Sequence, residues 1–225
     1  MVLAAGGDHA AAGTRRALEE LARSYWFPLY AFIRRQGRSA AQAEDLAQEF
    51  FARLLEKKYL ADVDRSKGKF RSFLLASLKH FLANERDRSR ALKRGGGAPL
   101  LALDALDAEA RYALEPADTL TAERLFDRRW ALAVLDQVMA RLRRDYADSG
   151  RLALYAALKD CLARGTSALN YAQLADALGM TQWAVKVAAH RLRRRYRDLL
   201  RSEIAQTVDS PRQVEEEIAY LLNCL

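Results

Sequence analysis

Apolar residues recur three and four positions apart along most of this chain, which is the spacing of one face of an α-helix. No segment alternates apolar and polar residues with the period of two that marks a half-buried strand. The pattern therefore predicts an all-α protein. The clearest apolar stripe lies in "FRSFLLASLKHFLANERDRSR" and consists of Phe70, Phe73, Leu74, Leu78, Phe81 and Leu82.

Capping residues mark the ends of the first helices. Thr14 can cap a helix that Gly37 stops. Ser39 followed by Gln42 forms a capping box, in which each residue satisfies an amide of the other, so a second helix should begin there. The polar stretch "ADVDRSKGK" then breaks the pattern and predicts a loop.

The second half of the chain is also helical. "GRLALYAALKDCLARG" predicts one helix, and "NYAQLADALGMTQWAVKVAAHRLRRRYRDLL" predicts two helices joined by a tight turn at Gly179. An earlier helix in "DRRWALAVLDQVMARLRRDY" carries apolar residues four apart, which are Trp130, Val134, Val138 and Leu142.

Changes in composition divide the chain into two small helical domains, with a helix-turn-helix in the C-terminal one. We expect a flexible tail at 1–13, a first domain at 14–94 and a second at 126–202. A flexible linker, more acidic than basic, joins them at 95–125, and an acidic extension follows at 203–225.

Charge adds a class of partner to this picture. Lys and Arg number 37 against 29 Asp and Glu, giving a net charge of +8, which indicates an anionic partner. Nothing predicts an enzyme or a cofactor, because the two cysteines and three histidines have no metal-ligand spacing and no phosphate loop or nucleophile motif is present. No apolar run approaches the roughly 18 residues that a membrane span needs.

The basic helix after Gly179 has two different faces. Ala189, Leu192, Tyr196 and Leu199 fall within about 40° of Val185 on a helical wheel, whereas Lys and Arg gather on the other side. Few acidic residues accompany this charge, which favours DNA over a merely solvated basic helix, the alternative reading.

The first turns of that helix should read bases in the major groove, and the arginines after them should hold phosphates. The candidate residues are Thr181, Gln182, Trp183, Lys186, Val187, His190, Arg191 and Arg194.

Three segments in this order resemble a bacterial RNA polymerase sigma factor of the extracytoplasmic-function group. "AEDLAQEFFARLLEK" is similar to the family's clamp-binding helix, "GKFRSFLLASLKHFLANERDR" to its −10 helix, and "NYAQLADALGMTQWAVKVAAHRLRRRYRDLL" to its −35 helix pair. With the tail after it, the last segment looks like a subgroup common in planctomycetes and myxobacteria.

The resemblance implies roles for residues of the first domain. Phe73 stands where the family usually has Trp, and His80 where many members have an Asn lining the pocket for a flipped base. The core polymerase would be bound by Glu44, Asp45, Gln48 and Glu49. The −10 element would be contacted by Lys67, Lys79, His80, Ala83, Asn84 and Arg86.

The implied partners are core RNA polymerase, through its β′ clamp and β flap, and promoter DNA, in a cytoplasmic, nucleoid-associated protein. Control by an anti-sigma protein, by a kinase or by the extension itself stays open. The extension ends in the amphipathic "VEEEIAYLLNCL", which we expect to dock on the same protein or on a regulator. The alternative function is a conventional helix-turn-helix regulator that binds duplex DNA without polymerase.

Overall fold

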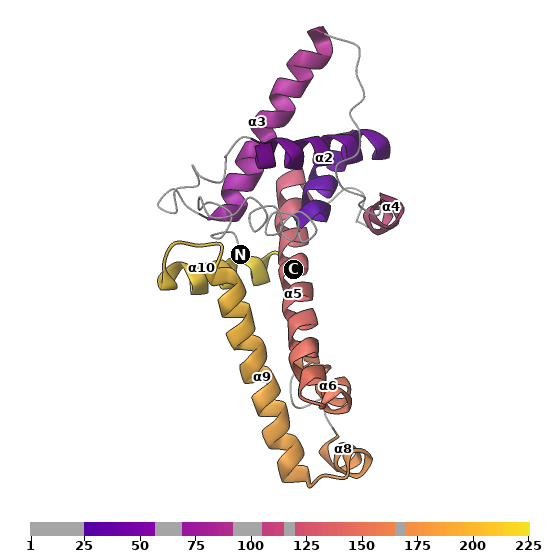
Figure 1. Cartoon of the computed structure of the whole chain (residues 1–225), viewed down its shortest axis with the longest axis vertical. Coiled ribbons are helices and arrows are strands. Elements are labelled where there is room, and N and C mark those ends of the chain that lie inside the picture. Colours follow the sequence, from indigo (N-terminus) through magenta and orange to yellow (C-terminus); the bar gives the residue numbers. More distant parts are fainter. Residues whose placement is uncertain (1–24, 57–68, 92–104, 115–119, 165–169) are drawn as a thin grey trace. The chain divides into compact units, whose positions relative to one another are not determined.

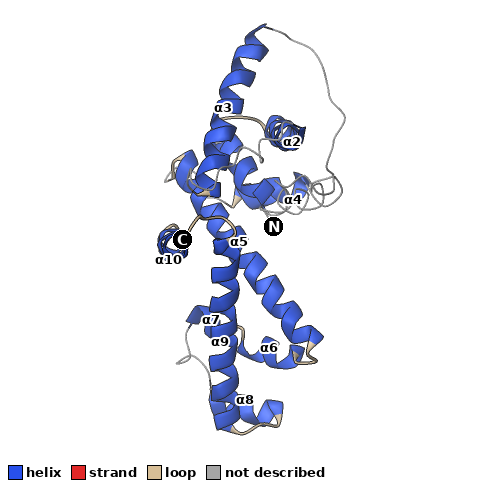
Figure 2. Ribbon diagram, turned by 60° about the vertical axis from the view of Figure 1, so that its left-hand side comes forward, coloured by secondary structure: helices blue, strands red, loops and turns tan. Residues whose placement is uncertain are grey.

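The computed structural model describes residues 25–56, 69–91, 105–114, 120–164 and 170–225. All regular elements in these ranges are helices (Figure 2), which confirms the all-α prediction for this part of the chain. No helix among them is long and apolar enough to cross a membrane. After a helical stretch at 25–35, the helices are α2 (Ala40–Glu56), α3 (Phe70–Ala91), α4 (Ala105–Ala113), α5 (Ala122–Asp148), α6 (Leu152–Leu158), α7 (Cys161–Arg164), α8 (Tyr171–Leu178), α9 (Gln182–Ala205) and α10 (Pro211–Asn223).

The described chain forms two compact units, and the boundaries between them fall within α5 and near the end of α9. Figure 1 labels both helices. The first unit extends to Ala133 and also includes Ile204–Leu225, while the second is Val134–Glu203. This division differs from the expected domains, because the start of α5 and nearly all of the C-terminal extension belong with the N-terminal helices.

Aromatic packing explains why the start of α5 belongs to the first unit. The ring of Trp130 stacks on Tyr25 with centroids 3.8 Å apart and lies 6.2 Å from Phe70 of α3. Phe126 meets the ring of Phe32 edge-on at 6.4 Å. Burial of such large rings dominates the energetics of a core, so the beginning of α5 is fixed where these partners are.

The capping box at the start of α2 is confirmed. The Ser39 amide donates to Gln42 Oε1 at 3.1 Å, and the Gln42 amide donates to Ser39 Oγ at 3.2 Å. The apolar stripe of α3 is also confirmed, with Leu74 and Leu78 completely buried and Phe73 half-buried at its margin.

Helix α4 lies within the predicted linker and is attached to the first unit. Glu109 accepts hydrogen bonds from the Tyr30 hydroxyl at 2.5 Å and from Arg34 Nε and Nη2 at 3.0 and 2.7 Å. The guanidinium of Arg34 also lies 4.9 Å from the ring centroid of Tyr112. This part of the predicted linker is therefore a helix that is docked on the first unit.

The second unit is built on the apolar stripe of α5. Val134, Val138 and Leu142 are buried as predicted. The single helix expected after Gly150 is instead two short helices, α6 and α7, separated by a turn at 159–160.

Candidate polymerase and nucleic-acid interfaces

The four residues predicted to bind core polymerase lie together on α2. Asp45 and Glu49 are exposed, while Glu44 and Gln48 are half-buried. The Gln48 side-chain amide donates to Glu44 Oε1 at 3.2 Å, which orders this part of the helix surface. The result is an exposed acidic face on a basic protein.

Arg53 connects this acidic face to α3 and was missed in the sequence analysis. It pairs with Glu49 one turn earlier and with Glu85 of α3 at 2.8 Å, and its guanidinium lies 4.9 Å from the Phe81 ring centroid. Burial acts to lower the pKa of Arg53, but the hydrogen bonds and charges of Glu49 and Glu85 outweigh it and raise that pKa. The spacing of four residues between Glu49 and Arg53 is a local sign of that pair. No local pattern indicates the pair between Arg53 and Glu85.

The solvent-facing side of α3 carries three of the residues predicted to contact the −10 element. Lys79, Ala83 and Arg86 are exposed and fall on one side of the helix. Lys79 Nζ lies 2.7 Å from Glu123 Oε1 of α5, and this hydrogen bond lowers the pKa of Glu123. The charge of Lys79 is therefore partly balanced within the unit. Lys67, the remaining predicted lysine, lies outside the described residues.

Two further predicted residues, His80 and Asn84, line a cavity of about 320 Å³ between α2 and α3. Its wall combines aromatic and aliphatic side chains with side chains that can donate or accept hydrogen bonds, a combination typical of sites for small ligand groups. The lining residues are Phe50, Arg53, Leu54, Ala76, Ser77, His80, Phe81 and Asn84.

In the second unit, α8 and α9 are joined by a short turn. Asn170 caps α8 by accepting from the Gln173 amide at 3.2 Å. Gly179 ends α8 in the left-handed conformation at φ 61°, which glycine adopts without strain. The Thr181 hydroxyl oxygen accepts from the Ala184 amide at 3.1 Å and so caps α9.

The exposed face of α9 carries the residues predicted to read DNA. Trp183 is 74% exposed, and Val187 is half-buried beside it. Lys186 Nζ lies 5.5 Å from the Tyr171 ring centroid of α8. On the opposite face Val185, like Ala189, Leu192 and Leu199, is buried as predicted, and Tyr196 is half-buried. The other predicted DNA contacts on this helix are all exposed, namely Gln182, Lys186, His190, Arg191 and Arg194.

Comparison with known families identifies one part of the chain. Residues 21–91 match the family model for sigma-70 region 2. The match supports a sigma-70 family RNA polymerase sigma factor, with a role in binding the polymerase and melting the promoter. Neither the curated proteins nor the solved structures contain a match to the chain.

The region 2 segment, residues 21–91, includes both α2 and α3. The acidic face, the exposed side of α3 and the cavity between the two helices therefore all belong to the part of the chain that the family model covers. Core RNA polymerase and promoter DNA are the partners that a region 2 domain implies.

Proposed function

We propose that the chain is a sigma factor of the extracytoplasmic-function group that directs core RNA polymerase to specific promoters. We further propose that it is related to the subgroup common in planctomycetes and myxobacteria. The observation that carries the proposal is the match of sigma-70 region 2 to the residues that build α2 and α3. Helix α9 follows a tight turn and has one apolar and one basic face, which supports the recognition of specific promoters.

In this proposal, α2 binds the β′ clamp of the polymerase through Glu44, Asp45, Gln48 and Glu49. An acidic surface on a protein of net charge +8 is suited to a basic partner surface, where complementary charge speeds association and fixes the register. The exposure of Asp45 and Glu49 supports this role, since contact residues must be accessible before binding.

Helix α3 would open the −10 element. Lys79 and Arg86 would contact the backbone of the displaced strand beside Ala83, and the cavity between α2 and α3 would receive a flipped base. A flipped base is held by stacking on apolar or aromatic side chains and by hydrogen bonds to its edge. The Phe50 and Phe81 rings could supply the stacking, and His80 and Asn84 could supply the hydrogen bonds. The composition of the cavity therefore supports this assignment.

Helices α8 and α9 would act as a helix-turn-helix on the −35 element, and this lobe would also bind the β flap. Gln182, Trp183, Lys186, Val187 and His190 would reach base edges, while Arg191 and Arg194 would hold phosphates. The Thr181 hydroxyl already caps α9, so we assign that residue to orienting the helix rather than to reading a base.

Reconstituted transcription with core polymerase on genomic fragments tests this function. We expect initiation at specific promoters whose shared sequences give the −10 and −35 elements together. The protein alone should not bind these promoters specifically. Specific binding to a palindromic duplex as a dimer, without polymerase, would instead identify a conventional helix-turn-helix regulator. Failure to form a stable complex with the core enzyme over a range of salt would also reject the proposal.

A further inference from the structure

Arg71, in the first turn of α3, is buried between residues of two other helices. Its side chain is only slightly exposed, and the residue as a whole is 7% exposed. Arg71 Nε donates to Glu217 Oε1 of α10 at 2.9 Å, and Nη1 pairs with Asp127 of α5. Burial acts to lower the pKa of Arg71, but the hydrogen bond and charge of Glu217 and the charge of Asp127 raise it overall. Arg71 is therefore a charged internal side chain.

Glu217 is the counterpart of Arg71 on α10 and is 1% exposed. It lies in the apolar stripe of that helix between the buried residues Val214 and Leu221. Its second carboxylate oxygen lies 2.8 Å from Lys69 Nζ. A carboxylate buried this deeply would be strongly unfavourable unless it were paired, so the two cations are what allow α10 to pack here.

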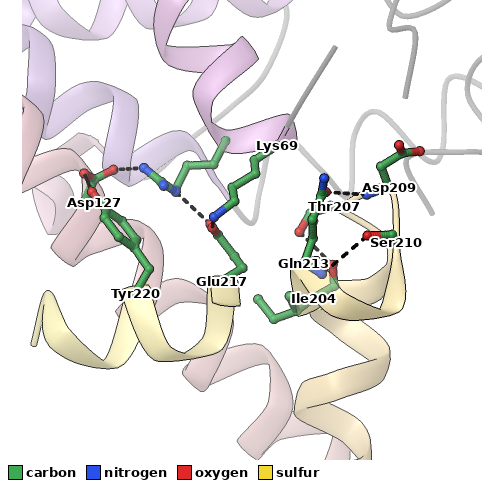
Figure 3. A network of polar contacts seen from close by, with 10 residues as sticks. Lys69, Asp127, Ile204, Thr207, Asp209, Ser210, Gln213, Glu217 and Tyr220 are labelled. Carbon is green, nitrogen blue, oxygen red and sulfur yellow. Dashed lines mark hydrogen bonds and ion pairs between the residues drawn. The ribbon is translucent and has the colours of Figure 1, made fainter. Parts of the chain in front are cut away.

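Tyr220, one turn after Glu217, closes the network. Its ring centroid lies 4.5 Å from the Arg71 guanidinium carbon, and its hydroxyl donates to Asp127 Oδ2 at 2.5 Å. Asp127 is thus held by Arg71 and by Tyr220 at once. Figure 3 shows the Tyr220 side chain of α10 directed toward Asp127 of α5, and the Glu217 carboxylate directed toward the end of the Lys69 side chain.

The segment before α10 contacts the backbone at the start of α3. The Phe70 amide, the first of the helix, donates to the Thr207 carbonyl at 2.9 Å. Such amides at a helix start have no partner within the helix, and Lys69, which precedes α3, cannot accept a hydrogen bond through its side chain. The carbonyl of Thr207 therefore supplies a cap that the local sequence does not.

Local sequence also specifies the shape of this C-terminal segment. Ser210 caps α10 by accepting from the Gln213 amide, and Pro211 occupies its first turn. The Asp209 amide donates to Gln213 Oε1 at 3.1 Å. Asp209, Ser210 and Gln213 are shown with Thr207 in Figure 3. The segment thus has a defined fold of its own at the point where it meets α3.

We infer that residues 204–225 are a brace for the region 2 domain. Glu217 and the Thr207 carbonyl, together with Asp127 of α5, fix the first turn of α3, so that promoter opening depends on α10 remaining docked. The inference rests on the proposed function, because α3 is the helix assigned to the −10 element. Buried ion pairs add little stability compared with apolar packing, but they can hold one orientation against others. Arg71 and Glu217 are positioning residues here and need not touch DNA.

The full-length variant Glu217→Gln tests the brace, with Glu216→Gln as its matched control. Both remove one negative charge from α10, but Glu216 is exposed and pairs only with Arg212 on the same helix at 3.0 Å among the contacts described. Three quantities are measured: amide hydrogen exchange in the first turn of α3, affinity for core polymerase, and promoter opening by the holoenzyme. We expect Glu217→Gln to speed exchange at the Phe70 amide and to lower opening by about tenfold, with core affinity within about twofold of wild type.

The control should match wild type in all three measurements. Unchanged opening and exchange in Glu217→Gln would overturn the brace, and so would equal effects of the two variants. Promoter opening in Glu217→Gln could also fall only in proportion to a loss of core affinity or of folded protein. That result would overturn the brace, because it would show that Glu217 has a general structural role.

If Glu217→Gln does not fold, Tyr220→Phe takes its place. This variant keeps the ring over Arg71 and removes only the hydrogen bond to Asp127. A smaller change of the same kind is expected, and no change would overturn the inference. If the wild-type protein opens no promoter with core polymerase, the proposed function fails, while the exchange measurement still decides whether the C-terminal segment braces α3.

Discussion

Arg195 of α9 and Asp145 of α5 are joined by two hydrogen bonds, from Nε at 2.8 Å and from Nη2 at 2.6 Å to the same carboxylate oxygen. The basic segment from Thr181 to Arg201 contains a single acidic residue, Asp198, and this scarcity favoured DNA as the partner of its arginines. Arg195 nevertheless has an acidic partner within the second unit, Asp145 on α5. In this it differs from Arg194, the exposed residue directly before it in the sequence.

Substitution of these two arginines should therefore have unequal effects on the salt dependence of DNA binding. Arg194→Ala should weaken binding to all −35 sequences about equally and reduce the slope of log K against log salt by about 0.9, the value for one lost phosphate contact. Arg195→Ala should reduce the slope less, because Asp145 already balances its charge. Titrations of holoenzyme with promoter DNA at several salt concentrations measure both slopes. Equal reductions would contradict the distinction.

Lys186→Ala should act on sequence preference rather than on general affinity. Lys186 is exposed near the start of α9, where side chains reach base edges in a helix-turn-helix. We expect a loss of roughly 1–3 kcal/mol that is confined to one promoter position. Binding to a panel of single-base promoter variants measures it, with Arg194→Ala as the non-selective comparison. A uniform loss across the panel would place Lys186 on a phosphate.

His80→Asn should change the base preferred in the −10 element. His80 lines the cavity between α2 and α3. In the proposed function it takes the position where many members of the extracytoplasmic-function group carry Asn. Replacing the ring alters the hydrogen-bonding groups available to a base in the cavity, so a change of about 1–3 kcal/mol at one −10 position is expected. Affinity for core polymerase should stay the same, which serves as the internal control. Transcription from −10 variants is the measurement, and an unaltered preference would remove His80 from the reading surface.

Glu109→Gln should make the fold less sensitive to acid. The hydrogen bond from Arg34, and then that from Tyr30, hold the pKa of Glu109 below its ordinary value of 4.5. The ionised carboxylate therefore stabilises the fold above that pH, and its contribution is lost as the pH falls through the lower pKa of the folded state. Denaturant unfolding from neutral to acidic pH should show a shallower fall for Glu109→Gln than for wild type. Parallel curves would show that this pair does not contribute to acid sensitivity.

The Tyr220→Phe variant should lose less stability than wild type as the pH rises into the alkaline range. The hydrogen bond to Asp127, together with burial, raises the pKa of Tyr220 from 10.0 to about 12. The protonated hydroxyl stabilises the fold fully below pH 10, and this contribution disappears as the pH rises to about 12. The difference in unfolding free energy between wild type and variant should therefore narrow across that window. A difference that stays constant from neutral to alkaline pH would contradict the assignment.

Local patterns in the sequence predicted those parts of the structure that local interactions determine. The hydrogen bonds of the Ser39 and Gln42 box span three residues, and the stripes of α3 and α5 repeat within single helices. The positions of the candidate DNA residues on α9 follow from the same periodicity. The turn between α6 and α7 was missed because neither Lys159 nor Asp160 is a residue that breaks helices, as glycine or proline would.

Contacts between polar residues far apart in the chain could not be predicted in this way. Arg71 and Glu217 are 146 positions apart, and each is of a type that is normally exposed. The one local sign was Glu217 itself, a charged residue at an apolar position of an amphipathic helix. The docking of α4 through Glu109 and Arg34 has no comparable sign, because acidic residues in a linker are ordinarily solvated.

The three tryptophans of the chain differ sharply in their surroundings. Trp26 is 4% and Trp130 1% exposed, whereas Trp183 projects from α9 with 74% of its surface open to solvent. A water-soluble quencher such as iodide should therefore extinguish emission from Trp183 while leaving the two interior indoles bright. A DNA duplex lying along α9 would shield that ring, so intrinsic fluorescence offers a label-free optical signal for occupancy of this helix alone.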